Sequence, residues 1–283
     1  MKVEPLCDAV GARVTGLNLA QPLDAGTHAA LHKAWMDYQV LVISDQDFTQ
    51  EEQINFARTW GPFPKRERYE KRVEKDTADK SIMLVSNIRE NGKPIGSLPD
   101  GEMMFHTDGS YDENPYNYTM LFAIELPKTG GHTLFSNMYM AYETLSDDMK
   151  RKLANCTAHQ GYYSGTVQRG QPVGGFNGEF SHPVFIEHNE TGRTALYVSR
   201  LITTRINELP QEESDEVLEF LFNHSEKSEF IYEHVWTEGD FVMWDNRCLN
   251  HARTDFPREE RRLLRRNVIQ GVRPERGRVD VAA

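Results

Sequence analysis

The chain has 283 residues and a formal net charge of -11, with 32 Lys and Arg against 43 Asp and Glu. That excess of negative charge disfavours a general affinity for nucleic acid or anionic membranes and favours a small-molecule partner. The cysteines at positions 7, 156 and 248 have no C-x-x-C spacing, so neither a disulfide framework nor a thiolate zinc site is indicated. With no apolar run of about 18 residues and no signal-peptide pattern, a cytoplasmic protein with no membrane span is expected.

The N-terminal part alternates strand and helix signals. Ala12–Leu19 reads as a short strand, and Asp24 opens a helix with apolar residues at three- and four-residue steps. An apolar strand follows at Val40–Ile43. Thr49 and Glu52 then form a capping-box pattern ahead of a second helix, which Gly61-Pro62 closes. These helices are expected to support a sheet.

Two polar tracts are candidates for loops that cover a site. Residues 65–80 carry dense mixed charge, and Asn87–Gly101 is rich in Gly, Pro and Asn and leads to His106; the tract 161–178 is rich in glycine. A charge run of this kind is usually a solvated face, but long polar loops beside a site also serve as lids. Residues 65–104 and 161–181 are therefore the candidate lid loops.

The remainder is mainly strands and turns, interrupted by two helices. The helices are expected at 147–155, after the cap Ser146, and at 212–223. The strands are expected at 82–85, 118–124, 133–135, 184–187, 195–198, 230–235, 241–244 and 264–270. Many short strands with long insertions predict a mainly β fold with helices (α+β), built as a jelly-roll barrel with helices packed outside. All-β folds of this size commonly stand as one domain, so residues 1–283 are expected to form one.

The segment Phe105-His106-Thr107-Asp108 sets an imidazole and a carboxylate two residues apart in a strand-like context. With a side-chain period of two, both would point to one face. Far downstream, His251 supplies a third candidate ligand. Two histidines and one carboxylate with open positions form the facial arrangement of non-haem Fe(II) oxygenases. The alternative is that these are structural histidines, with His251 held by Asp245 or by the backbone.

A second candidate site is the arginine-rich segment 258–269. If its later part is a strand, Arg262 and Arg266 lie on one face and Arg261 and Arg265 on the other. A guanidinium group binds a carboxylate or sulfonate through two parallel hydrogen bonds, so two inward arginines could anchor two anions. The alternative is an exposed basic strand that forms ion pairs with Glu259 and Glu260.

Taken together, these features resemble the taurine and aryloxyalkanoate dioxygenases, the Fe(II)- and 2-oxoglutarate-dependent TauD/TfdA family, over nearly the whole chain. The resemblance is carried by matching stretches at residues 11–16 (GARVTG), 21–23 (QPL), 105–108 (FHTD), 125–134 (ELPKTGGHTL), 141–146 (AYETLS), 182–184 (HPV), 203–206 (TTRI) and 244–251 (WDNRCLNH). It implies a double-stranded β-helix with packed helices and long lid loops.

The resemblance also implies roles for individual residues. His106, Asp108 and His251 match the iron ligands, and Thr133 matches the residue that hydrogen-bonds the co-substrate 2-oxoglutarate. Arg262 matches the arginine that binds the distal carboxylate of 2-oxoglutarate. Arg266 matches an arginine that, in the taurine enzyme, faces the anionic end of the substrate. Tyr162 and Tyr163 are further candidates for an aromatic-tolerant substrate site, with ordinary packing as the alternative.

The activity implied is Fe(II)- and 2-oxoglutarate-dependent oxidation of a small anionic organic substrate, with consumption of O2 and release of succinate and CO2. Residues 63–69 hold no histidine where the taurine enzyme places a substrate-binding one, so taurine itself is not favoured. A carboxylate, sulfonate, sulfate ester or aryloxy acid remains. Two other hypotheses use the same three ligands: a metal-dependent hydrolase and a non-catalytic ligand-binding barrel. Family members are often dimers or tetramers, and no feature of the sequence selects a homo-oligomeric state.

Overall fold

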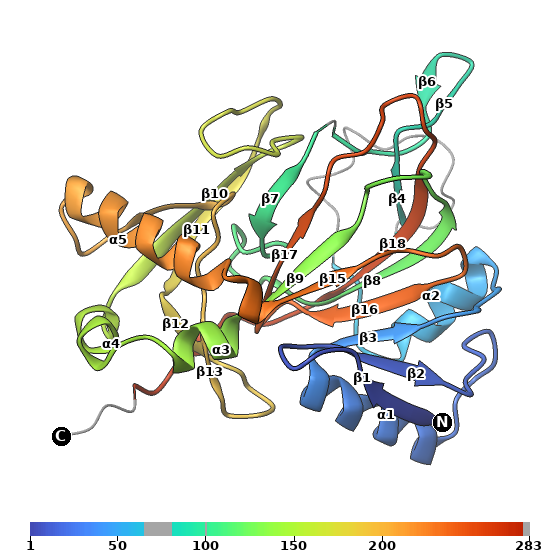
Figure 1. Ribbon diagram of the computed structural model, residues 1–283, viewed down its shortest axis with the longest axis horizontal. Coiled ribbons are helices and arrows are strands. Elements are labelled where there is room, and N and C mark those ends of the chain that lie inside the picture. Colours follow the sequence, from blue (N-terminus) through green and yellow to red (C-terminus); the bar gives the residue numbers. More distant parts are fainter. Residues whose placement is uncertain (65–80, 100, 280–283) are drawn as a thin grey trace.

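A computed structural model describes residues 1–64, 81–99 and 101–279. Its largest unit is a sheet whose strands follow the order β1-β2-β3-β16-β8-β18-β4 (Figure 1). These strands are β1 (Lys2–Pro5), β2 (Ala12–Thr15), β3 (Val40–Ile43), β16 (Phe241–Asp245), β8 (Tyr116–Glu125), β18 (Leu263–Gln270) and β4 (Met83–Ser86). All of these neighbours pair antiparallel except β2 and β3, which run parallel.

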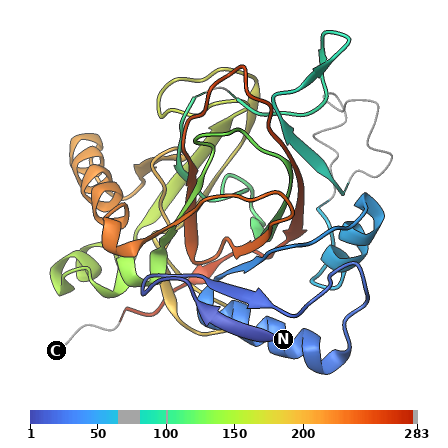
Figure 2. The ribbon, with the colours of Figure 1, turned by 45° about the vertical axis from the view of Figure 1, so that its right-hand side comes forward.

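A four-stranded sheet in the order β15-β9-β17-β7 faces the inner side of the large sheet (Figures 1 and 2). Its strands are β15 (Ile231–His234), β9 (Thr133–Asn137), β17 (Leu249–Arg253) and β7 (Met103–His106). Side chains from both sheets line one cavity between them. This cavity is where the candidate site residues gather.

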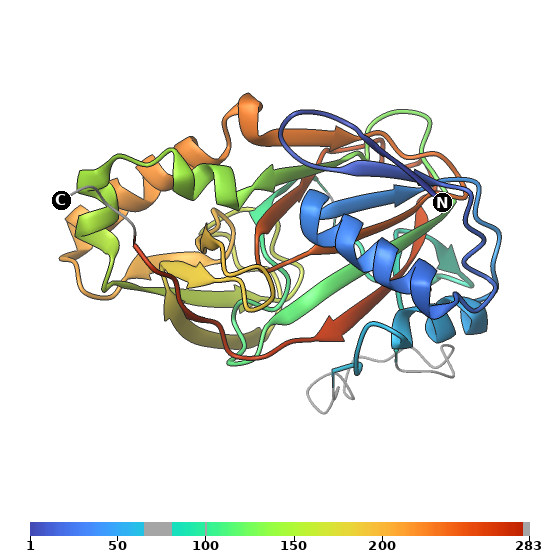
Figure 3. The ribbon, with the colours of Figure 1, turned by 90° about the horizontal axis from the view of Figure 1, so that it is seen from below.

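Two helices cover the outer side of the large sheet (Figure 3). Helix α1 (Ala25–Tyr38) begins after Asp24, whose carboxylate accepts two backbone N–H bonds, and α2 (Gln50–Arg58) begins with the expected capping box of Thr49 and Glu52. Both helices bury apolar residues against the outward side chains of β2, β3, β8 and β16. The remaining core packs on the inner side of that sheet.

Most of the other elements lie at the end of the molecule away from α1 and α2 (Figure 1). Helices α3 (Met138–Glu143), α4 (Asp147–Leu153) and α5 (Gln211–Ser225) lie at that end, with the 3-10 turn η1 (Ser228–Phe230). Strands β10 (Thr157–Tyr163), β11 (Phe176–Pro183) and β14 (Thr203–Ile206) form one small sheet. Strands β12 (Phe185–Glu187), β13 (Thr194–Leu196) and β19 (Glu275–Arg276) form another, and β5 (Arg89–Glu90) pairs with β6 (Lys93–Pro94).

The expected strand-rich fold with helices is confirmed, although the described strands form separate sheets rather than one closed barrel. The candidate loop 161–181 is largely a hairpin, because its two ends belong to β10 and β11. The candidate loop 65–104 lies partly outside the described residues. No helix in the described part of the chain is long and apolar enough to cross a bilayer.

Candidate active site

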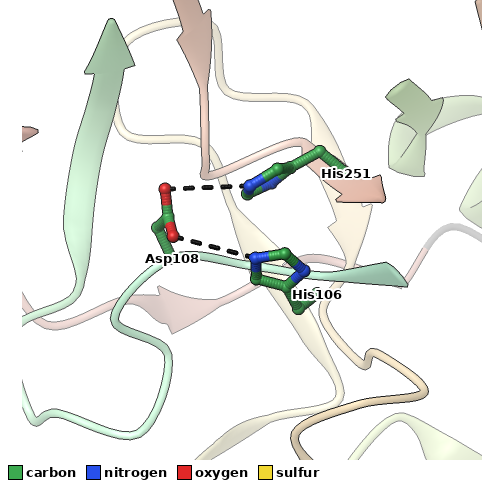
Figure 4. A group of neighbouring side chains, drawn as sticks. All are labelled: His106, Asp108 and His251. Atoms are coloured by element: carbon green, nitrogen blue, oxygen red, sulfur yellow. Dashed lines mark ion pairs between the residues drawn. The ribbon is translucent and has the colours of Figure 1, made fainter. Parts of the chain in front are cut away.

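His106, Asp108 and His251 come together at one point of the cavity (Figure 4). His106 is the last residue of β7, and His251 lies directly opposite it on β17. Their Nε2 atoms are each 3.9 Å from the Asp108 carboxylate, His106 from Oδ1 and His251 from Oδ2. Asp108 itself lies beyond the end of β7, so the expected strand does not extend through it. The chain turns there and still brings the carboxylate to the two rings.

Burial and neighbouring groups together set the charge state of the three side chains. Burial lowers the pKa of both His106 and His251, so the two rings are neutral near pH 7. Burial raises the pKa of Asp108, but the charge of Arg266 and the hydrogen bond from Thr119 act against it, and that pKa lies below its usual value. Two neutral imidazoles and one ionised carboxylate are the forms in which these residues bind a metal ion.

The hydrogen bonds around His106 fit the same reading. Its Nδ1 lies 3.0 Å from the carbonyl oxygen of Met104, to which it donates as the protonated ring nitrogen. The lone pair of Nε2 then faces Asp108, as a ligand nitrogen requires. The donor set of two nitrogens and one oxygen suits a divalent transition metal and leaves other coordination positions open.

Strand β18 places its arginines as the alternation pattern predicted. Arg262, just before the strand, and Arg266 line the cavity, whereas Arg265 lies on the other face against Phe48 and Phe122. Arg266 Nη2 is 2.5 Å from Asp108 Oδ2. The substrate-binding candidate therefore contacts one of the metal-binding candidates directly.

Arg262 is almost fully buried, and a turn of two glycines makes room for it. Its Nη2 donates to the carbonyl of Gly131 at 3.2 Å, while Nε and Nη1 have no hydrogen-bond partner in the described structure. Gly131 has φ +67°, and a Cβ there would lie 3.2 Å from Arg262 Nε. Burial, together with the charge of Arg253, lowers the pKa of Arg262 to about 9. An anion in the cavity would offset that cost.

Thr133, at the start of β9, also lines the cavity. The indole N–H of Trp236 donates to its hydroxyl oxygen at 3.0 Å. A hydroxyl has one hydrogen and two lone pairs, so this contact leaves the Thr133 hydrogen available to a bound acceptor.

The cavity has a volume of about 300 Å³, and apart from the polar groups above its walls are mostly apolar. Tyr162 lines it and stacks on Tyr111, with the ring centroids 5.3 Å apart. Tyr163 does not reach it: the ring is 42% exposed and packs on Phe176. Only Tyr162 of the two continues as a substrate-binding candidate. The aliphatic and thioether part of the wall consists of Ile82, Met83, Leu84, Val85, Leu98, Pro99, Met103, Leu121, Ile202, Ala252 and Val268.

The comparisons with known proteins agree with this geometry. A family model described as taurine catabolism dioxygenase TauD, TfdA family matches residues 2–267. The chain belongs to the TauD/TfdA family. It is thereby an oxidoreductase of the 2-oxoglutarate-dependent, non-haem iron dioxygenase class, with Fe(II) as metal and 2-oxoglutarate as co-substrate. The expected family, enzyme class, metal and co-substrate are thereby confirmed.

Relatives in the TauD/TfdA family differ in the substrates that they are named for. The chain is 30% identical to (S)-phenoxypropionate/alpha-ketoglutarate-dioxygenase of Sphingobium herbicidovorans, over 95% of this chain and 94% of that protein. It is 35% identical to pentalenolactone F synthase of Streptomyces avermitilis, over 92% and 90%. The crystal structure of AAD-2 in complex with Mn(II) and N-oxalylglycine has a TM-score of 0.81 and 26% identity, over 96% of this chain and 98% of that one.

The sequence did not reveal the polar residues behind the TauD/TfdA site. Thr119 on β8 donates its hydroxyl hydrogen to Asp108 Oδ2 at 2.7 Å, and Asn246 donates to the Thr119 oxygen at 2.9 Å. The sequence feature that could have indicated this contact is Thr119 within the otherwise apolar run 118–124. A threonine needs a hydrogen-bond partner when its side chain is buried.

A second group of possible metal ligands, His188, Asp245 and Cys248, is fully buried. The Asp245 carboxylate already accepts two bonds from the Arg247 guanidinium, at 2.9 and 2.6 Å, and a third from the Arg247 backbone N–H at 2.9 Å, and His188 lies 3.0 Å from it. Burial raises the pKa of the Cys248 thiol well above its usual value, which keeps it protonated. This TauD/TfdA chain therefore holds there a neutralised ion pair that joins β16 to its neighbours.

Proposed function

We propose that the protein oxidises a small organic anion with an apolar body, using His106, Asp108 and His251 to hold Fe(II). The observation that carries this proposal is the placement of Arg262, just before β18, and of Arg266, on β18, in the same cavity as those three residues. Of the three arginines that line the cavity, Arg253 donates to the backbone carbonyls of Pro99 and Gly101. The cavity thus offers a metal-binding group and, in Arg262 and Arg266, two separate cationic partners for anions. The distal carboxylate of the co-substrate and the carboxylate of the substrate can then each bind one arginine, Arg262 and Arg266 respectively.

Arg262 and Thr133 are the residues proposed to bind the co-substrate. Arg262 binds the distal carboxylate of 2-oxoglutarate through the nitrogens that lack a protein partner, and Thr133 donates its hydroxyl hydrogen to the same molecule. When bound, Fe(II) and 2-oxoglutarate supply the activation of O2, and the co-substrate leaves as succinate and CO2. The protein positions the substrate carbon and keeps water away from it.

The substrate is a carboxylate with an apolar or aromatic body. Arg266 binds its charged end, and the aliphatic wall together with Tyr111 and Tyr162 surrounds the rest. Apolar walls with few polar groups are typical of sites that orient an apolar ligand by one polar anchor. The phenoxypropionate named for the Sphingobium herbicidovorans relative is of this kind, which supports an aryloxy acid before a sulfonate or a sulfate ester.

The surrounding fold is proposed to act as one catalytic domain, with the two facing sheets as a double-stranded β-helix. Two segments at the rim are proposed to cover the substrate. In the first, Ser97, Leu98 and Pro99 line the cavity. In the second, Ser164 and Gly165, between β10 and β11, do so together with Asn177 near the start of β11, and the backbone N–H of Met104 on β7 donates to the carbonyl of Val167.

The test is an anaerobic titration followed by a turnover screen. With Fe(II) and 2-oxoglutarate, the wild-type protein should give a weak visible charge-transfer band that His106→Ala and Asp108→Ala lack. Under air, succinate release should depend on an added carboxylate with an apolar body. No band with correctly folded wild type would exclude the proposal. Turnover with Zn(II) and without O2 consumption would favour the hydrolase instead.

A further inference from the structure

A series of hydrogen bonds connects four buried side chains and ends at the Asp108 carboxylate. The indole N–H of Trp244 donates to Asn246 Oδ1 at 3.0 Å, and Asn246 Nδ2 donates to Thr119 Oγ1 at 2.9 Å. The Thr119 hydroxyl then donates to Asp108 Oδ2 at 2.7 Å. Trp244, Asn246 and Thr119 are each at most 1% exposed, so water does not compete for these bonds.

The donor and acceptor groups allow only one direction of hydrogen bonding along this series, from Trp244 to Asp108. An indole N–H is a donor alone, so Trp244 can be satisfied only by the oxygen of the Asn246 amide. The amide nitrogen then faces Thr119 and fills a lone pair of its hydroxyl oxygen. A hydroxyl has a single hydrogen, and with Asn246 already donating, that hydrogen is directed to Asp108. Each group thus fixes the orientation of the next.

The two oxygens of Asp108 differ as a result. Oδ2 receives the bond from Thr119 and the ion pair from Arg266 and lies 3.9 Å from His251 Nε2, whereas Oδ1 receives neither and lies 3.9 Å from His106 Nε2. A carboxylate held at one oxygen cannot turn freely about its C–C bond. Both oxygens are then presented to the two histidines in one orientation.

We infer that Thr119 is a positioning residue that holds the Asp108 carboxylate in one orientation beside His106 and His251, with Asn246 and Trp244 holding Thr119 in the donating orientation. This inference rests on the proposed role of Asp108 in holding Fe(II). Groups that hydrogen-bond a ligand typically change metal affinity by about 10- to 100-fold when removed.

The experiment compares Thr119→Val, Thr119→Ser and a matched control, using Mn(II) as the probe metal. Valine keeps the shape of threonine and removes the hydroxyl, whereas serine restores the hydroxyl. The control is Thr203→Val on β14, because Thr203 is equally buried and donates to Gln160 at 2.8 Å, outside the cavity lining. Calorimetry gives the Mn(II) affinity, thermal unfolding of the metal-free protein gives the stability, and the anaerobic Fe(II) and 2-oxoglutarate spectrum reports the ligand field.

Thr119→Val should weaken Mn(II) binding by about 10-fold or more and shift the visible band, whereas Thr119→Ser should restore both. Thr203→Val should lose comparable thermal stability and keep the affinity and the band. Equal affinity in wild type and Thr119→Val, or no rescue by serine, would overturn the inference. Wild type that binds no Mn(II) would instead refute the proposed function.

Discussion

The guanidinium of Arg266 lies 2.5 Å from the carboxylate of Asp108, so a group proposed to bind substrate also contacts a group proposed to hold the metal. A guanidinium has five N–H donors in a planar fork and can contact more than one anion. Arg266 therefore connects the charge of the substrate to that of the metal site.

The first prediction concerns Arg266→Ala. Coupled turnover of an apolar carboxylate should fall by about 100-fold in kcat/KM, since losing a buried charged partner costs about 3 kcal/mol. Binding of 2-oxoglutarate should persist, as measured by the anaerobic visible band. The methyl ester of the same substrate serves as control and should lose far less. Loss of 2-oxoglutarate binding would mean that the roles of Arg262 and Arg266 are exchanged.

A second prediction separates stability from co-substrate binding at Arg262. The side chain is buried with two nitrogens unpaired in the described structure, so Arg262→Met should raise the free energy of unfolding of the ligand-free protein by about 1 to 4 kcal/mol. The same variant should lose the increase in the free energy of unfolding that 2-oxoglutarate gives to wild type. Urea unfolding with and without 2-oxoglutarate measures both effects. A variant that is less stable and still stabilised by the co-substrate would contradict this prediction.

The third prediction is a pH dependence that arises at His182. Burial lowers the pKa of this ring to about 4, and its Nε2 lies 3.0 Å from the Asp112 carbonyl. Because the pKa is lower in the folded state than in the unfolded one, the unfolded chain takes up the proton first as pH falls. The stabilisation is complete above about pH 6.5 and is lost by about pH 4, for a total of about 3 kcal/mol.

The measurement is urea unfolding at several pH values for wild type and His182→Gln. Glutamine keeps an N–H donor and does not titrate. The difference in unfolding free energy between the two proteins should therefore shrink or change sign between pH 7 and pH 4. A difference that stays constant over that range would show that His182 is not the titrating group.

The fourth prediction concerns the buried pair of Asp245 and Arg247. Arg247→Met should lower the free energy of unfolding by about 3 to 5 kcal/mol, because it leaves the Asp245 carboxylate buried and uncompensated. Replacing both partners by apolar residues should recover much of that loss.

Zn(II) should not raise the unfolding free energy of wild type through the buried cluster of His188, Asp245 and Cys248. Stabilisation by Zn(II) that disappears in Cys248→Ala would identify a metal site there.

Much of the fold could be predicted where local chemistry decides the structure. The apolar run Val40–Ile43 has the bounds of β3, and Thr49 with Glu52 forms the capping box that its spacing predicted. The alternation of arginines near β18 followed from a side-chain period of two. In these cases the residues carry their own structural signal.

Elements whose residues are polar for tertiary reasons could not be predicted. Strand β17 has Asn, His and Arg within five residues, all buried, so its sequence lacks the apolar pattern of a strand. Strands β10 and β11 contain glycine and polar residues, so their sequences do not show the pattern of a strand. The pairing of β10 with β11 and with β14 stabilises them. The contacts of Asp108 with Thr119 and Arg266 join three distant segments, and no local pattern encodes them.

The pairing of His106 with His251 across β7 and β17 has a consequence for how the protein becomes functional. The two residues are neighbours in the sheet but belong to distant parts of the chain, and β9 completes β17 on its other side. Contacts of such long sequence separation are slow to form, because the entropy of loop closure opposes them until they are made. A growing polypeptide that has passed β7 but not β17 still lacks His251, one of the three proposed ligands. Uptake of metal at the proposed site therefore requires that β17 has been synthesised and has paired with β7.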